Sequence, residues 1–172
     1  MSKPVAVITG ASRGIGRSIA IKFASNGFDL FIGGTNPNTL KELQSELEHD
    51  FQCKCSYFAA DLSVENQCQL FVDAILNQYT KIDVLVNNAG VFLGGKMMEE
   101  DATQLAKMMN TNLFSAYWVT KFLWNSFAEN ARSHIFNMCS IASFTAYAAG
   151  GSYSISKFAL LGFSKSLRLE GL

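Results

Sequence analysis

Tyr153 and Lys157 are the residues of this sequence whose types and spacing most clearly suggest chemistry. Residues four apart lie on the same face of a helix, so the phenol and the ammonium group would face the same way. A free phenol has a pKa of about 10, and a nearby positive charge favours its ionised form. Such a pair suits proton transfer. Ser140 stands 13 residues before Tyr153, at the end of a predicted strand.

A second tyrosine–lysine pair at the same spacing, Tyr117 and Lys121, is distinguished from the first by its position. Tyr117 lies in the middle of a long helical pattern, beside Trp118 and Phe122, where packing is the expected role. Tyr153 instead begins a helix directly after the loop that follows a strand. The spacing alone is a weak signal, and the position favours Tyr153 as the chemical group.

A glycine-rich turn at residues 9–16 follows a β-branched run at 5–8 and precedes apolar residues at helical spacing. Glycine permits tight turns and lets a ligand approach the main chain. The start of a helix offers free N–H groups and the positive end of a dipole, which suit a pyrophosphate. The order Gly10, Gly14, Gly16 differs from the commonest dinucleotide fingerprint. The turn alone therefore predicts either a nucleotide site or a merely structural bend.

Strand and helix patterns alternate along the chain, which predicts a parallel sheet covered by helices on both faces. The predicted strands cover 5–8, 30–32, 53–59, 82–86 and 134–138, and long helical patterns cover 103–129 and 153–170. Ligands of such sheets bind beyond the carboxyl ends of the strands. The glycine turn, Asp61, residues 87–90 and Ser140 all fall there.

Helix starts and buried faces can also be predicted between these strands. Asn36 is expected to cap a helix whose first residue is Pro37. Leucines at 40, 43 and 47 would form its buried face. Ser63 is expected to cap the next helix, with Leu70 and Phe71 on its buried side.

In combination these motifs resemble those of the short-chain dehydrogenase/reductase family, from residue 5 to about 170. The turn at 9–16 resembles the family's cofactor loop, residues 87–90 resemble its post-strand motif, and residues 153–157 resemble its Tyr-x-x-Ser-Lys signature. Asn112 falls where the family has a catalytic asparagine. The resemblance implies an α/β fold, a Rossmann-like doubly wound parallel sheet in three α/β/α layers. It also implies a single dinucleotide-binding catalytic domain over residues 1–172.

The resemblance implies an oxidoreductase that transfers hydride between a nicotinamide cofactor and a small carbonyl or secondary-alcohol substrate, similar to 3-oxoacyl reductases. Tyr153 would be the acid/base, Lys157 would bond the nicotinamide ribose, Ser140 would hold the substrate oxygen and Asn112 would position a relay water. No metal is implied. The implied cofactor-binding residues are Gly10, Ser12, Arg13, Gly14, Ile15, Gly16, Thr35, Asp61, Leu62, Asn88, Ala89, Gly90, Tyr153 and Lys157.

The residues after the second strand favour NADP(H), with NAD(H) as the alternative. A carboxylate there would bind the ribose 2′-hydroxyl of NAD, but residues 33–36 contain no acid. Arg13, the Thr35 hydroxyl and the amides that open the helix at Pro37 could instead meet a 2′-phosphate.

Composition narrows the class of protein further. The 172 residues carry 14 basic and 14 acidic side chains, which gives no reason to expect a nucleic-acid or membrane partner. The sequence has no apolar run of membrane-spanning length. Cys53, Cys55, Cys68 and Cys139 lack zinc-site spacing and are expected to be buried, reduced thiols. A cytoplasmic location follows as an expectation.

Two other functions stay open on the sequence alone. One is a non-catalytic nucleotide-binding regulator with the same fold. The other is an S-adenosylmethionine-dependent methyltransferase, which would not need Tyr153 and Lys157 near Ser140. Aromatic residues within 113–124 exceed one buried stripe and predict a homodimer or homotetramer. Because family members continue with a further strand and a substrate lid, residues beyond Leu172, forming a missing C-terminal part of the usual fold, are expected in the working protein.

Overall fold

The computed structural model describes residues 3–128 and 133–170 and contains one five-stranded sheet. All strand pairs are parallel, in the order β3-β2-β1-β4-β5. The strands are β1 (Val5–Ile8), β2 (Asp29–Gly34), β3 (Cys55–Ala59), β4 (Val84–Asn87) and β5 (His134–Asn137). The predicted α/β fold with a doubly wound parallel sheet is confirmed.

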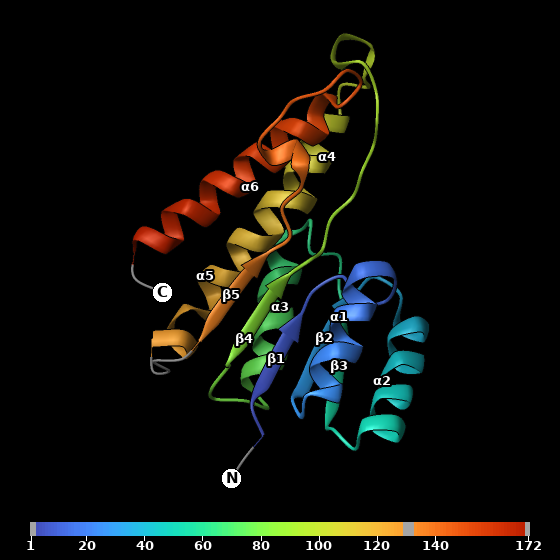
Figure 1. Cartoon of the computed structure of the whole chain (residues 1–172), viewed down its shortest axis with the longest axis vertical. Coiled ribbons are helices and arrows are strands. Elements are labelled where there is room, and N and C mark those ends of the chain that lie inside the picture. Colours follow the sequence, from blue (N-terminus) through green and yellow to red (C-terminus); the bar gives the residue numbers. More distant parts are fainter. Residues whose placement is uncertain (1–2, 129–132, 171–172) are drawn as a thin grey trace.

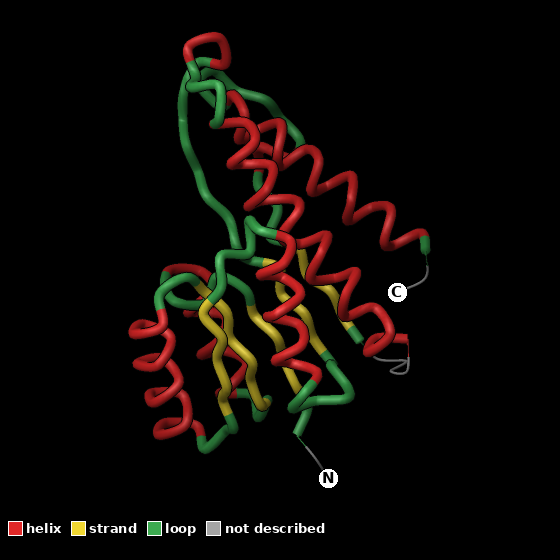
Figure 2. Tube along the Cα trace, turned by 180° about the vertical axis from the view of Figure 1, so that it is seen from behind, coloured by secondary structure: helices red, strands yellow, loops and turns green. Residues whose placement is uncertain are grey.

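Helices cover both faces of this sheet, as Figures 1 and 2 show from opposite sides. The α-helices are α1 (Gly14–Ser25), α2 (Pro37–Phe51), α3 (Glu65–Leu76), α4 (Gln104–Met109), α5 (Ser115–Ala128) and α6 (Gly151–Leu169). Helices α1 and α2 cover one face, and α3 and α5 cover the other. The α4 end of the molecule and the start of α6 project beyond the carboxyl edge of the sheet (Figure 1).

Alternation of side chains along β1 divides the core into two clusters, because successive residues of a strand point to opposite faces. Val5 and Val7 belong to the cluster under α3 and α5. Ala6 and Ile8 belong to the cluster under α1 and α2. All four are buried, as a central strand of a parallel sheet requires.

The predicted start of α2 is confirmed, whereas the predicted start of α3 is wrong. The Asn36 side chain accepts a hydrogen bond from the amide of Asn38 at 2.9 Å and caps α2. Val64, not Ser63, precedes α3 as its N-cap residue, and it makes no side-chain cap. The Ser63 hydroxyl instead donates to Asp61 Oδ1 at 2.7 Å, so it serves the turn before the helix.

Three further expectations need correction. Leu70 is 43% exposed, because α3 presents Phe71 and Val72 to the core and turns Leu70 outward. Cys139 is only partly buried, whereas the other three cysteines are buried. The helix predicted at 103–129 is divided by a π-helical turn, Asn110–Phe114, between α4 and α5. Its predicted last residue lies outside the described part of the chain. In the described part, no helix is both long and apolar enough to cross a membrane.

Candidate active site

A cleft of about 770 Å³ opens at the carboxyl edge of the sheet. The chain enters it after every strand and again at α6. Its lining comprises Gly10, Ser12, Arg13, Gly14, Ile15, Gly16, Gly34, Thr35, Asn36, Thr39, Ala60, Asp61, Leu62, Asn88, Ala89, Gly90, Val91, Phe92, Thr111, Met138, Cys139, Tyr153 and Lys157. All fourteen residues that the sequence proposed for cofactor binding therefore lie around one cavity, and Asn112 and Ser140 are not among the lining residues.

The glycine turn is built for close approach between β1, α1 and residues 88–100 after β4, which we call the post-β4 segment. Gly10 has φ +63° and Gly14 has φ +55°, which disfavour other residue types. A Cβ on Gly16 would lie 2.9 Å from the carbonyl carbon of Gly10, so α1 can start here only without a side chain. Asn88 Nδ2 donates to the carbonyl oxygens of Thr9 and Gly10, each at 3.0 Å. The turn and the post-β4 segment are thus held together.

The N-terminus of α1 faces the cleft, and no acidic side chain of the described residues caps it. Arg13 is the N-cap residue in extended conformation and makes no side-chain cap, and the first turn has no acid. First-turn amides have no partner inside a helix. An anionic ligand such as a phosphate group would satisfy these donors and the dipole of the helix.

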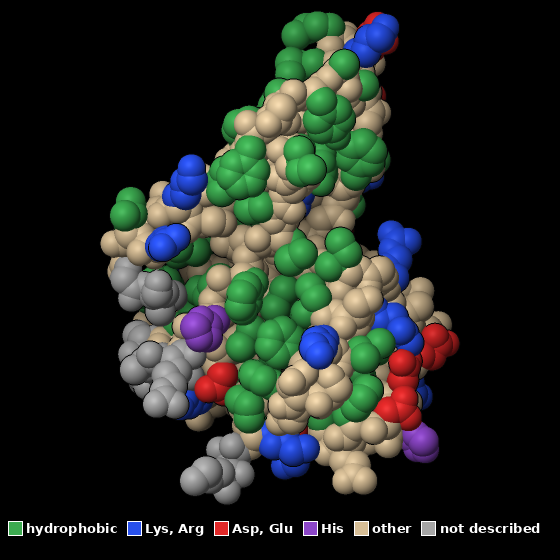
Figure 3. Space-filling model, in the orientation of Figure 1, with side chains coloured by type: hydrophobic (Ala, Val, Ile, Leu, Met, Phe, Trp, Pro, Cys, Tyr) green, Lys and Arg blue, Asp and Glu red, His purple; other side chains and the backbone are tan. Residues whose placement is uncertain are grey.

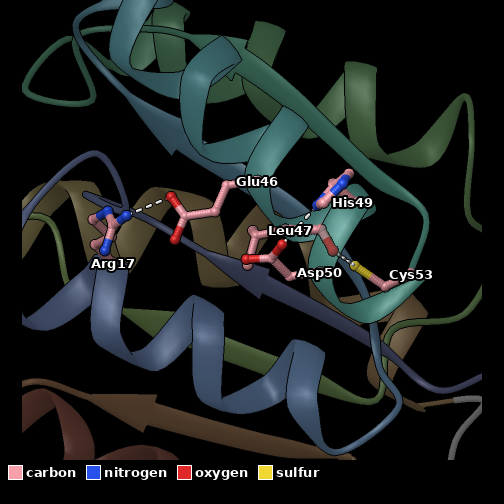
Figure 4. A network of polar contacts seen from close by, with 6 residues as sticks. All are labelled: Arg17, Glu46, Leu47, His49, Asp50 and Cys53. Carbon is pink, nitrogen blue, oxygen red and sulfur yellow. Dashed lines mark hydrogen bonds and ion pairs between the residues drawn. The ribbon is translucent and has the colours of Figure 1, made fainter.

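The two arginines near this helix start differ in whether their charge is paired, and Figure 4 shows the paired one, Arg17. Arg17 on α1 makes an ion pair with Glu46 on α2, which offsets its charge. Arg13 lines the cleft, is exposed, and has no ion pair within residues 3–128 and 133–170. The end of β2 brings Gly34, Thr35 and Asn36 to the same part of the cleft without a carboxylate.

Lys157 contributes a buried ammonium group to the lining of the cleft. Its side chain emerges from α6, is 7% exposed, and donates from Nζ to the carbonyl oxygen of Met138 at 2.7 Å. Burial lowers the pKa of Lys157, and the nearby Cys139 opposes that shift only in part. Two N–H donors of the ammonium group remain for a ligand.

Tyr153 lies one helical turn before Lys157, on the same side of α6. The Lys157 Nζ atom is 5.9 Å from the centre of the Tyr153 ring. The Phe92 ring meets the Tyr153 ring edge-on, with centroids 4.8 Å apart and planes at 88°. The phenol therefore stands between an aromatic side chain of the post-β4 segment and the buried ammonium group.

The Asn112 side chain is engaged by protein groups at both ends. Its Oδ1 accepts from the amide of Val91 at 2.7 Å, and its Nδ2 donates to the Val91 carbonyl and to the Ser156 hydroxyl. Asn112 thus joins the π-helical turn to the post-β4 segment and to α6 beside Lys157. Only the second lone pair of Oδ1 remains for a water.

Ser140 caps a short 3₁₀ turn, Ile141–Ser143, after β5. Its Oγ accepts from the amide of Ala142 at 3.2 Å, and its own amide donates to Ser143 Oγ at 3.1 Å. The Ser140 hydroxyl donates to no acceptor among the residues that the structure describes, so it can still donate a hydrogen bond to a ligand.

Several cleft residues were not proposed from the sequence. They are Gly34, Asn36, Thr39, Ala60, Val91, Phe92, Thr111, Met138 and Cys139. Ala60, Met138 and Cys139 directly follow a strand, so the rule that ligands bind beyond strand ends could have indicated them. Phe92 and Thr111 carry no such signal, because their place depends on how the post-β4 segment and the π-helical turn fold back.

Comparison of the sequence with a family model and with individual proteins gives dehydrogenases and reductases in both cases. The family model described as short chain dehydrogenase matches residues 4–172. A diacetyl reductase [(S)-acetoin forming] of Staphylococcus epidermidis is 31% identical over 172 residues, which cover 99% of this chain and 66% of that protein. A 3-oxoacyl-[acyl-carrier-protein] reductase FabG of Aquifex aeolicus is 31% identical over 166 residues, 96% of this chain and 67% of that protein. The chain thus spans about two thirds of these relatives.

Similar solved structures also include dehydrogenases. An alcohol dehydrogenase from Thermococcus sibiricus, complexed with 5-hydroxy-NADP, has a TM-score of 0.95 at 27% identity over 98% of this chain and 72% of that one. A short chain dehydrogenase/reductase from Burkholderia phymatum, in complex with NAD, has a TM-score of 0.91 at 30% identity over 96% of this chain and 59% of that one.

Proposed function

The chain belongs to the short chain dehydrogenase family, and on this premise we propose that it transfers hydride between a nicotinamide cofactor and a carbonyl or secondary-alcohol substrate. Tyr153 is the proposed acid/base. The observation that carries the proposal is that Tyr153 and Lys157 line the same cleft as the glycine turn and the uncapped start of α1. Residues 1–172 act in this proposal as one dinucleotide-binding catalytic domain.

The cleft fits a dinucleotide at both of its ends. Gly14 has open space where a Cβ would stand, and the first amides of α1 have no anionic partner in the part of the chain that the structure describes. These groups, with Ser12, Ile15 and the backbone near Asn88 to Gly90, would hold the pyrophosphate side. Asp61 and Leu62 would border the adenine ring, and Tyr153 and Lys157 would hold the nicotinamide ribose. When bound, the cofactor supplies the hydride.

In this proposal four side chains have separate roles in moving the proton and holding the substrate oxygen. Tyr153 gives its hydroxyl proton to a carbonyl oxygen, or takes one from an alcohol. The ammonium group of Lys157 stabilises negative charge on the phenol oxygen. The Ser140 hydroxyl donates to the same substrate oxygen, and Asn112 fixes α6 and can hold a water through its remaining lone pair. The proposal leaves the substrate open, although carbonyl reductases are prominent among the relatives.

We propose NADP(H) as the preferred cofactor, with NAD(H) as the alternative. Both cofactors occur in the similar solved structures. Arg13, which has no ion pair among the residues that the structure describes, supports NADP(H), as do the Thr35 hydroxyl and the absence of an acid at 33–36.

The test of the proposed function is the change in absorbance of reduced nicotinamide when the protein is mixed with a panel of carbonyl compounds. Tyr153→Phe should lower kcat at least about a hundredfold, the usual scale for a general acid–base group. Its cofactor Kd should stay within a few-fold. Tyr117→Phe is the matched control, because Tyr117 packs against Trp118 and Phe163 away from the cleft and should keep normal turnover. Cofactor binding without turnover would favour the non-catalytic regulator.

We also propose that the protein is a homodimer or homotetramer. Phe114, Tyr117 and Phe158 are each more than a third exposed, and α5 touches α6 through Tyr117 and Phe163. Hydrophobic side chains also gather over the α4 and α6 end of the molecule in Figure 3. Light scattering that gives only a monomer at micromolar concentration would contradict this proposal. The expected cytoplasmic location stays a prediction.

A further inference from the structure

The start of α6, which carries Tyr153, is held by a residue 52 positions earlier in the chain. Glu100 Oε1 accepts a hydrogen bond from the amide of Ser152 at 3.0 Å. Glu100 Oε2 accepts from the hydroxyl of the same serine. Ser152 is 2% exposed and directly precedes Tyr153. The carboxylate of Glu100 therefore binds the first turn of α6 through both its oxygens.

The backbone around this contact leaves no room for a side chain at residue 151. Gly151 has φ +35°, and a Cβ on it would lie 2.7 Å from Glu100 Cδ and 3.0 Å from the Gly95 carbonyl oxygen. The amide of Gly95 donates to the carbonyl of Ala149 at 3.1 Å. The segment after β4 is thus attached to the start of α6 at two adjacent points.

Helix α6 has no local cap of its own. Its N-cap residue, Gly150, has no side chain to accept from the first amides, and the first turn contains no acid. Unsatisfied first-turn amides and the positive end of the helix dipole both favour a carboxylate. Glu100 supplies it from another part of the chain, as a capping residue that is distant in sequence.

We propose that Glu100 is a positioning residue for Tyr153. This inference rests on the proposed function and names a residue that acts on the acid/base through the helix. Glu100 fixes the turn that carries Tyr153, while Phe92, from the same post-β4 segment, meets the Tyr153 ring edge-on with the ring centroids 4.8 Å apart. The segment from Phe92 to Glu100 thereby sets where the phenol stands over the cleft.

The proposal predicts a specific kinetic effect. Without the carboxylate, the first turn of α6 loses its anchor and Tyr153 shifts, and a displacement of about 1 Å can cost about a hundredfold in rate. Glu100→Ala should therefore lower kcat about ten- to a hundredfold. The cofactor Kd should stay within a few-fold, because the glycine turn lies on other elements.

The conservative variant and a neighbouring acid give matched comparisons. Glu100→Gln keeps an oxygen for the Ser152 amide and an N–H₂ group for the Ser152 oxygen, so it should restore most of the rate. Glu99→Ala removes an exposed acid whose one ion pair within the described residues is with Lys96, at 2.9 Å, and should leave kcat unchanged. Ser152→Ala keeps the amide contact with Glu100 and loses the hydroxyl contact. Its kcat should therefore lie between those of wild type and Glu100→Ala.

Hydrogen exchange gives a readout that does not depend on turnover. In Glu100→Ala, amides of a peptide covering 150–157 should exchange faster than in wild type, and in Glu99→Ala they should not. Wild-type protein that turns over no carbonyl or alcohol would overturn the proposed function, while exchange would still test the contact. Unchanged exchange and a kcat within twofold of wild type in Glu100→Ala would overturn the inference. Loss of kcat with equal loss of cofactor affinity, unrescued by Glu100→Gln, would show a general structural role instead.

Discussion

At the scale of single residues, the site is defined by which polar groups are already satisfied by the protein and which are not. Met138 takes one donor of Lys157, and Val91 takes both ends of the Asn112 amide. The Ser140 proton, two Lys157 donors and the first amides of α1 remain without such partners among the described contacts. A ligand that complements these groups carries a carbonyl or hydroxyl at one end and an anion at the other.

Arg13 is expected to decide the cofactor preference. A hydrogen bond to a charged group is worth about 1.5–3 kcal/mol, which corresponds to about ten- to a hundredfold in affinity. NADPH should therefore bind at least about tenfold tighter than NADH at low salt, with the gap narrowing as salt screens the charges. Arg13→Ala should remove much of the difference in measured Kd.

Arg17→Ala is the matched control for that experiment. Arg17 lies one helical turn further along α1, but its charge is already paired with Glu46. Its removal should leave the ratio of the two dissociation constants nearly unchanged. Equal affinities of the wild-type protein for NADPH and NADH would mean that the missing acid after β2 has no bearing on the choice of cofactor.

At the scale of elements, the sequence predicted what depends on local pattern and missed what depends on distant contacts. The alternation of strands and helices, the Asn36 cap and the position of Tyr153 at the start of α6 could all be predicted. The π-helical turn could not, because Asn112 reaches Val91 and Ser156 only in the folded chain.

Helix starts show the same limit. Ser63 has a residue type that favours caps, yet its hydroxyl donates a hydrogen bond to Asp61, two residues earlier. The cap of α6 comes from Glu100, 52 residues before Ser152, and no local pattern predicts such a contact. Local propensity is a weak guide where a tertiary partner can satisfy the same amides.

The Asn36 cap gives a prediction for α2. Asn36→Ala removes the acceptor for the amides of Asn38 and Thr39, at 2.9 and 3.4 Å, and should lower the free energy of unfolding by about 1 kcal/mol. Urea unfolding without cofactor measures the loss. Asn38→Ala, an exposed change in the same turn, should stay within about 0.5 kcal/mol of wild type. Similar losses in both variants would argue against the cap.

At the scale of the whole molecule, stability comes from two apolar clusters that the sheet separates. Buried thiols belong to both: Cys68 to the cluster under α3 and α5, and Cys55 to the cluster under α1 and α2. Burial raises the pKa of Cys68 to about 12, with smaller contributions from Glu65 and Asp61. Burial also raises the pKa of Cys55. The core therefore contains thiols whose ionised form is disfavoured by burial.

These shifts predict a loss of stability in alkali with a definite sign. The folded-state pKa of Cys68 lies above the unfolded value of about 8.5–9, so the unfolded chain releases the proton first. Its contribution to stability is complete below about pH 8.5 and is lost as pH rises toward about 12, by up to about 1.4 kcal/mol per pH unit. The lowered pKa of Lys157 acts with the opposite sign, but equally in every variant that retains this lysine.

Cys68→Ala should therefore be less stable than wild type near neutral pH, because it leaves a small cavity, yet lose less stability as pH rises from about 8 to about 10.5. Urea unfolding under reducing conditions at several pH values gives the free energy of unfolding of each protein. The slope of this free energy against pH is then compared between Cys68→Ala and wild type. Val72→Ala is the matched control, because Val72 is fully buried in the same cluster and does not titrate. Its curve should run parallel to that of wild type. A Cys68→Ala curve that is also parallel to wild type would show that this thiol ionises as readily in the folded core as in the unfolded chain.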